Sequence, residues 1–141
     1  MNQYDDITYK INGCAMKVHN TLGNGFQEVI YQRCLAIELE KARLNFAREL
    51  EQEIFYEQIL VGRRRADFVV ENDIIVEIKA VINLEDVHLA QAKNYLVAYD
   101  KPVGLLINFG ATSLQFKKVF NQKYNLNLGN LQNRQHQDLQ N

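Results

Sequence analysis

The sequence predicts an α/β protein with a central mixed β-sheet, flanking helices and an N-terminal helical hairpin. Two stretches near the N-terminus carry apolar residues at helical spacing. The middle of the chain contains short runs rich in β-branched residues, separated by turn residues, which is typical of strands. A third helical stretch lies between two such runs and provides the crossover that parallel strands need.

The helical hairpin is expected over residues 5–21 and 26–43. In the first helix the residues at helical spacing are Ile7, Ile11, Cys14, Val18 and Leu22. Gly23-Asn24-Gly25 separates the helices, because glycine and asparagine favour the left-handed conformation that ends a helix. In the second helix Glu28 shares a stripe with Tyr31. Glu28 is either paired or bound to a ligand there, or it is a solvated acid favoured by the helix dipole.

The expected strands are residues 46–57, 59–70 with a bend at Gly62, 74–79, 103–109 and 114–120. The run at 103–109 is almost wholly apolar, which is typical of a buried parallel strand. The run at 114–120 alternates and carries lysines, which protect an edge strand. The crossover helix is expected from Leu84 to Tyr99. Residues 1–120 therefore form one domain, and the Asn/Gln-rich segment 121–141 is predicted to be a disordered tail.

The bulk composition excludes several classes of protein. A net charge of −1 excludes a uniformly basic surface, so contacts with nucleic acid must come from local patches. No apolar run approaches the roughly 18 residues that span a bilayer, and the polar N-terminus does not resemble a signal peptide. Cys14 and Cys34 lack metal-site spacing and are expected to be reduced thiols of a cytoplasmic protein.

The central feature of the sequence is a hairpin of two strands around the loop 71–73. If Val70 pairs with Ile74, Asp67 lies opposite Glu77, and Arg65 lies opposite Lys79. One face is then wholly apolar and consists of Ala66, Phe68, Val70, Ile74, Val76 and Ile78.

Two carboxylates placed opposite each other repel and need compensation. One interpretation is a divalent cation between Asp67 and Glu77, since Mg²⁺ is often bound by one or two carboxylates. The other is a lattice of charges in which Asp67 pairs diagonally with Lys79, and Glu77 with Arg65.

Asp67, nine intervening residues and Glu77-Ile78-Lys79 resemble the D…(D/E)xK signature of the PD-(D/E)XK nuclease superfamily, with Ala66 in place of its proline. The segment 25–31 resembles the GxxExxY pattern of a small bacterial family in that superfamily. The segment 91–95 is similar to the QxxxY motif of RecB-like nucleases. Together these motifs extend the resemblance over residues 5–120.

The resemblance implies a nuclease-like core and a metal-dependent nuclease. Asp67 and Glu77 hold Mg²⁺ or Mn²⁺ in this interpretation, with Glu28 and the carbonyl of Ile78 as further ligands. Lys79 orients the attacking water or stabilises charge that grows on the phosphate. The expected catalytic residues are thus Asp67, Glu77, Lys79 and Glu28.

Two groups of residues are candidates for contact with nucleic acid. Arg63, Arg64 and Arg65 suit phosphate, or they neutralise the acids Glu49, Glu51, Glu53 and Glu57. His88, Gln91 and Tyr95 share one helix face, where they position the nucleic-acid backbone, orient the lysine, or form a half-buried polar seam.

The predicted function is metal-dependent hydrolysis of phosphodiester bonds in nucleic acid, with DNA favoured over RNA. The alternative is a non-catalytic regulatory module that keeps the fold and binds nucleic acid or protein. The weak overall basicity favours this alternative, or else a homodimer or a partner protein that supplies the DNA contacts.

Overall fold

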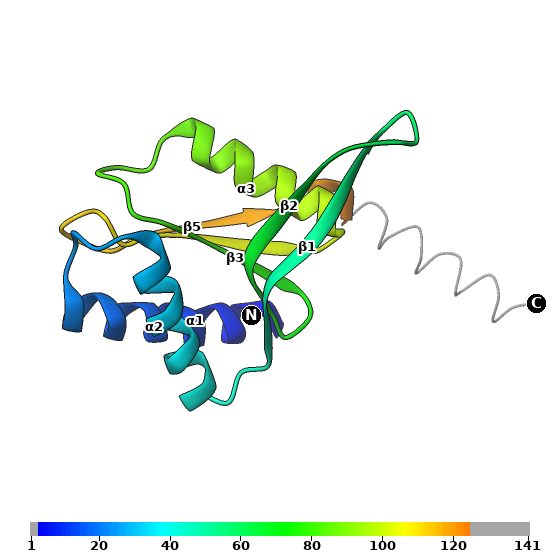
Figure 1. Ribbon diagram of the computed structural model, residues 1–141. Helices are drawn as coiled ribbons and strands as arrows, with labels where there is room; N and C mark the ends of the chain where they lie inside the picture. The colour runs from blue at the N-terminus through cyan, green and yellow to red at the C-terminus, as the bar shows by residue number, and fades with distance from the viewer. Residues whose placement is uncertain (1–2, 125–141) are drawn as a thin grey trace, which may run out of the picture.

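The computed structural model describes residues 3–124, which form three helices and one five-stranded sheet (Figure 1). In chain order the elements are α1 (Gln3–Leu22), α2 (Glu28–Lys41), β1 (Phe46–Tyr56), β2 (Ile59–Val70), β3 (Ile74–Lys79), α3 (Asp86–Tyr99), β4 (Val103–Asn108) and β5 (Gln115–Phe120). The strand order is β1-β2-β3-β4-β5, and only β3 and β4 are parallel, joined through α3. The predicted α/β class, mixed sheet and N-terminal helical hairpin are therefore confirmed.

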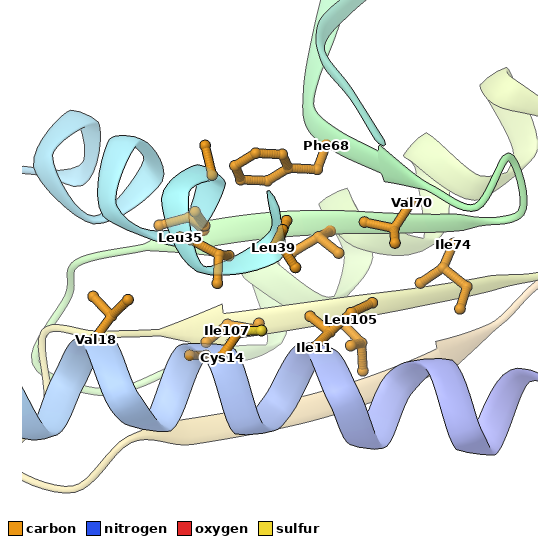
Figure 2. Packing of buried hydrophobic residues seen from close by; sticks show 14 of the residues in the cluster. Ile11, Cys14, Val18, Leu35, Leu39, Phe68, Val70, Ile74, Leu105 and Ile107 are labelled. Atoms are coloured by element: carbon orange, nitrogen blue, oxygen red, sulfur yellow. The ribbon is translucent and has the colours of Figure 1, made fainter. Parts of the chain in front are cut away.

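The sheet separates two layers of helices, with α1 and α2 on one face and α3 on the other (Figure 1). Figure 2 shows α1 contributing Ile11, Cys14 and Val18 beneath the Leu105 and Ile107 side chains of β4. The smaller apolar cluster under α3 includes Ala66, Val69, Ile75, Ala92, Leu96 and Leu106. β4 is buried along its whole length between these layers, as its apolar sequence predicts.

The turn between α1 and α2 is fixed by Gly25 and Tyr31. Gly25 has a φ of 112°, a conformation that a side chain disfavours. The Tyr31 hydroxyl donates to the Gly23 carbonyl at 2.6 Å and accepts the Phe26 N–H at 3.2 Å. Its ring stacks on Phe109 with centroids 4.7 Å apart. The glycine and the tyrosine of the GxxExxY pattern thus hold the turn, so α2 begins at Glu28.

The hairpin of β2 and β3 has the predicted register near its turn, with Val70 opposite Ile74 and Phe68 opposite Val76. Beyond Phe68 the two strands part. β2 continues with β1 as a two-stranded ribbon that projects from the body of the protein (Figure 1). The expected pairing of Arg65 with Lys79 is therefore wrong, because the pairing of β2 with β3 extends only from Val70 to Phe68, and Arg65 pairs on its other side with Glu51 of β1.

The backbone of β1 is irregular at Glu49, close to the point where β2 and β3 part. Arg48 pairs with Phe68 and Leu50 with Ala66, while Glu49 between them has a φ of 50°. A non-glycine residue with positive φ breaks the regular pleat. Ala66 packs in the cluster under α3 while Phe68 packs in the other cluster, so the expected place of Ala66 on the same face as Phe68 is wrong.

Some boundaries differ from the expected ones. α2 begins two residues later than the expected Phe26, and α3 begins at Asp86 after its N-cap, Glu85. The folded segment also extends past residue 120, because the Asn121 side chain is buried and donates to the carbonyls of Leu96 and Lys101. Most of the predicted tail, residues 125–141, lies outside the described residues. Among residues 3–124, no helix is long and apolar enough to cross a membrane.

Candidate active site

Asp67 and Glu77 face each other across the gap where β2 and β3 part. The Ile78 N–H donates to Asp67 Oδ2 at 2.7 Å, and the Asp67 N–H donates to Glu77 Oε1 at 3.3 Å. Each carboxylate therefore takes the place of a backbone acceptor from the neighbouring strand. In an extended strand the N–H and C=O of one residue point to the same side, so the Ile78 carbonyl faces this gap as well.

The surroundings of the two carboxylates disfavour their charged forms. Burial raises the pKa of Glu77 to about 8, with a further contribution from the nearby Asp67 charge. Burial also raises the pKa of Asp67, and the Glu28 charge adds to this shift. Glu77 is only 6% exposed. The pair is thus a place where a proton or a cation is favoured.

The expected charge lattice is not formed within the described residues 3–124. Arg65 bonds Glu51 on β1 at 3.5 Å, and the Lys79 ammonium donates to the Gln91 amide oxygen at 3.3 Å. Neither Asp67 nor Glu77 has an ion pair within this part of the chain. The buried Glu77 and the half-buried Asp67 lack the cationic partners that a purely structural arrangement would supply.

A hydrogen-bond chain from α2 orients Asp67. The Gln32 amide donates to Asp67 Oδ1 at 2.9 Å, and Arg48 donates to the Gln32 oxygen at 3.0 Å. Because Arg48 occupies the oxygen, the Gln32 nitrogen must face Asp67. Neither Gln32 nor Arg48 was identified from the sequence. Gln32 lies four residues after Glu28 and therefore on the same face of α2. This spacing is the feature of the sequence that indicates a place for Gln32 near the site.

Replacing Gln32 with alanine is expected to lower the free energy of unfolding by about 1–3 kcal/mol, because Asp67 Oδ1 then loses its buried donor. Urea unfolding measures this loss. The matched control is Gln27→Ala at the N-cap of α2, whose side chain makes no capping hydrogen bond. Equal losses in the two variants would show that Gln32 does not hold Asp67.

Glu28 is the first residue of α2 and is exposed. It lies beside Asp67 in a cavity of about 260 Å³, which Gln32 and Glu49 also line. Glu77 is outside the lining of this cavity. Glu28 thus has access to Asp67 but not to both carboxylates, and its position also suits the helix dipole.

Lys79 and the α3 residues lie on the other side of the pair. Gln91 orients Lys79, which is one of the roles that the sequence suggested for it. The pKa of Tyr95 is raised by burial and further by the Glu77 charge. The His88 Nδ1 accepts the Glu85 N–H in the α3 cap, so this nitrogen is occupied by a structural role.

Asn108 fixes the chain just after Lys79 and was not identified from the sequence. Its side-chain oxygen accepts the N–H groups of Val81 and Gly110, and its nitrogen donates to the Val81 carbonyl. A side chain at Gly110 would place its Cβ 2.4 Å from the Val81 backbone. This tight contact holds the end of β3, and with it Lys79, at the site.

The three arginines divide between two faces. Arg63 bonds Glu51 at 3.0 Å, and Arg65 bonds the same carboxylate. Both therefore pair with a β1 acid, which is the alternative that the sequence left open, and their contact with nucleic acid stays a prediction. Arg64 points to the opposite face, with its guanidinium 4.2 Å from the centre of the Tyr95 ring.

The site fits a hard divalent cation only in part. Within the described part of the chain, no three histidine, cysteine, aspartate or glutamate side chains stand close enough to hold a metal ion by themselves. The donors facing the gap are two carboxylates and one carbonyl, all oxygen. Mg²⁺ often takes one or two carboxylates and fills its other positions with water and substrate phosphate, so this donor set suits it.

Comparisons with known proteins agree with this geometry. A family model described as the PD-(D/E)XK nuclease superfamily matches residues 5–119. A structure titled "Crystal structure of SSO0001" superposes with a TM-score of 0.54 at 21% identity, covering 66% of this chain. The match covers 49% of that chain, so the present protein spans about half its length, and the likeness shows the fold alone. A search of the curated proteins finds no match.

Proposed function

The chain belongs to the PD-(D/E)XK nuclease superfamily, and we propose that it hydrolyses phosphodiester bonds of nucleic acid, DNA in preference to RNA, with Mg²⁺ or Mn²⁺. The observation that supports this proposal most directly is the carboxylate pair of the buried Glu77 and the half-buried Asp67, which has no ion-pair partner within residues 3–124. Such a pair is costly unless a cation joins it.

In this proposal Asp67, Glu77 and the carbonyl of Ile78 bind the metal ion, and Glu28 is an additional ligand through water. The bound ion supplies Lewis acidity toward the phosphate and lowers the pKa of a bound water. Gln32 keeps Asp67 in its orientation.

Lys79 lies at the end of β3, and its ammonium group is held by Gln91 at the edge of the site. There it orients the attacking water and stabilises charge that develops on the phosphate oxygens. Gln91 is exposed and Tyr95 half-buried, so their polar groups are accessible to the nucleic-acid backbone. His88 is a weaker candidate, because one ring nitrogen serves the helix cap.

The finer assignments extend the superfamily membership. The roles of Gly25 and Tyr31 in the α1–α2 turn support assignment to the GxxExxY family, since they explain two of its three defining residues. The free cysteines Cys14 and Cys34 suit a cytoplasmic protein.

The alternative function is a non-catalytic module that binds nucleic acid or a protein partner. One observation favours it: two of the three arginines are paired with acids, so the net charge of −1 is not offset by a broad basic surface. A homodimer or a partner protein would then supply additional contacts.

Millimolar Mn²⁺ is expected to raise the melting temperature of the native protein, because a ligand that binds only the folded state stabilises it by about 2.7 kcal/mol at a hundredfold excess over Kd. Glu77→Ala should abolish this rise, since it removes one carboxylate of the pair. Glu40→Ala, at an exposed position of α2, is the matched control and should keep it. Thermal unfolding with Mn²⁺ or with a chelator measures the difference, and no shift in the native protein would contradict a metal site.

A further inference from the structure

A groove of about 460 Å³ lies between the projecting β1–β2 ribbon and α3. The ribbon contributes Phe55 and Arg64, and α3 contributes Asn94. Lys123, which follows β5, lines the groove as well and is exposed. Glu53 is the acid in this lining, and it lies 3.8 Å from the Arg63 guanidinium. Apart from Glu53 and the neutral Asn94, the lining is apolar or basic.

Within residues 3–124, Arg63 and Arg65 form ion pairs with acids of β1, whereas Arg64 forms none. Its guanidinium stacks on Tyr95, which holds the side chain in one place. Its Nε is buried and has no hydrogen-bond partner within the described residues. The Arg64 side chain also lines the groove, where a phosphate oxygen is an acceptor that suits a guanidinium group.

Phe55 gives the groove an aromatic wall. Its side chain is 57% exposed, so its ring is accessible to a ligand in the groove. A cationic groove with exposed aromatic rings is the arrangement by which proteins bind single-stranded nucleic acid, since bases stack on the rings and phosphates meet the cations. A duplex keeps its bases stacked inside and cannot use such a ring.

A chain of side-chain contacts along α3 links the groove to the candidate active site, because Arg64 of the groove lies on Tyr95. Gln91, which holds Lys79, and Tyr95, which carries Arg64, are one helical turn apart, a rise of about 5–6 Å. A strand that reaches the carboxylates can therefore extend past Tyr95 to the Arg64 side chain.

We propose that this groove binds a single-stranded segment of nucleic acid next to the phosphate that is cut, with a base on Phe55 and a phosphate on Arg64. The inference rests on the proposed nuclease function and adds a substrate class to it: single strands, or single-stranded flanks of a duplex.

The test is fluorescence anisotropy of the full-length protein with a labelled 20-nucleotide DNA, single-stranded or annealed to its complement, in the presence of a chelator. The native protein should bind the single strand more tightly than the duplex. Arg64→Gln and Phe55→Ala should each weaken single-strand binding about tenfold. Arg64→Gln should also lower the slope of log affinity against log salt by about 0.7.

Each variant has a matched control. Arg43→Gln makes the same change of charge at an exposed position of the α2–β1 turn, and Tyr56→Ala removes a neighbouring exposed ring outside the groove lining. The affinity of both control variants should stay within about twofold of the native affinity, a difference of about 0.4 kcal/mol in binding free energy. Lys123→Gln, at an exposed position, tests the groove independently if Arg64→Gln fails to fold.

The outcomes separate this inference from the proposed function. Three results would overturn the proposal that the groove binds a single strand. They are tighter binding of the duplex, no measurable binding, and equal effects in the groove variants and their controls. If the native protein nevertheless cuts DNA with Mn²⁺, the nuclease function stands without it. If binding depends on Arg64 and Phe55 but no metal supports cleavage, the groove stands as a binding surface and the nuclease function fails.

Discussion

Glu77→Gln is expected to make the metal-free protein more stable than the native chain at pH 8 and above, by on the order of 3–5 kcal/mol. Folding raises the pKa of Glu77 from its ordinary value of 4.5 to about 8, chiefly through burial. Between these two values the folded protein binds more protons than the unfolded chain. The free energy of unfolding of the native protein therefore falls as the pH rises through this window. Glutamine cannot ionise, so the variant escapes this loss.

The measurement is urea unfolding of both proteins from pH 4.5 to 9 with a chelator present. The free energy of unfolding of the variant should still fall as the pH rises, but less steeply than that of the native protein. The remaining fall is due to Asp67, whose pKa is also raised by folding. Glu40→Gln, an exposed acid on α2, controls for the loss of one carboxylate. A native profile that does not decline toward pH 8, or a Glu77→Gln variant that is less stable than the native protein there, would contradict the buried carboxylate pair.

Lys79→Ala is expected to lower the rate of phosphodiester cleavage by about 10²–10³-fold while the melting-temperature rise with Mn²⁺ remains. Lys79 is not a metal ligand, and its ammonium group is bonded to Gln91 and not to either carboxylate. Its removal therefore takes away charge stabilisation on the phosphate and leaves the metal-binding donors in place. Single-turnover cleavage and thermal unfolding, each with Mn²⁺, measure the two effects separately.

The control for Lys79 is Lys10→Ala on α1, an exposed lysine that forms only a surface pair with Asp6. It should change neither cleavage nor stability. If Lys79→Ala instead lowers stability strongly and leaves cleavage unchanged, the lysine serves the fold, and the charge-lattice interpretation of the hairpin gains support.

The sequence predicted the local part of the fold well because alternation and turn residues determine it. The pairing of Val70 with Ile74 follows from a short polar loop between two apolar runs, and the structure has this register. The apolar run of β4 likewise predicted a parallel, fully buried strand. The prediction failed for Ala66, which packs under α3 while Phe68 packs on the other face, since regular alternation cannot show where a strand departs from it.

The sequence predicted those residues of the candidate site that belong to recognisable motifs, and it did not predict the residues that support them. The contact of Gln32 with Asp67 joins α2 to β2 and depends on how the helix packs, which local patterns do not specify. The division of the arginines was within reach of the sequence. Strand alternation alone places Arg64 on the face opposite to Arg63 and Arg65, so the three arginines should not be expected to act as one basic patch.

The most direct test of the proposed function is incubation of the native protein with circular, linear and branched DNA and with RNA, with and without Mn²⁺. Cleavage of at least one substrate is expected with Mn²⁺. It should stop when a chelator is added and should be absent in Glu77→Ala. No cleavage of any substrate, together with no Mn²⁺-dependent rise in melting temperature, would contradict a metal-dependent nuclease and leave the binding module as the function of this fold.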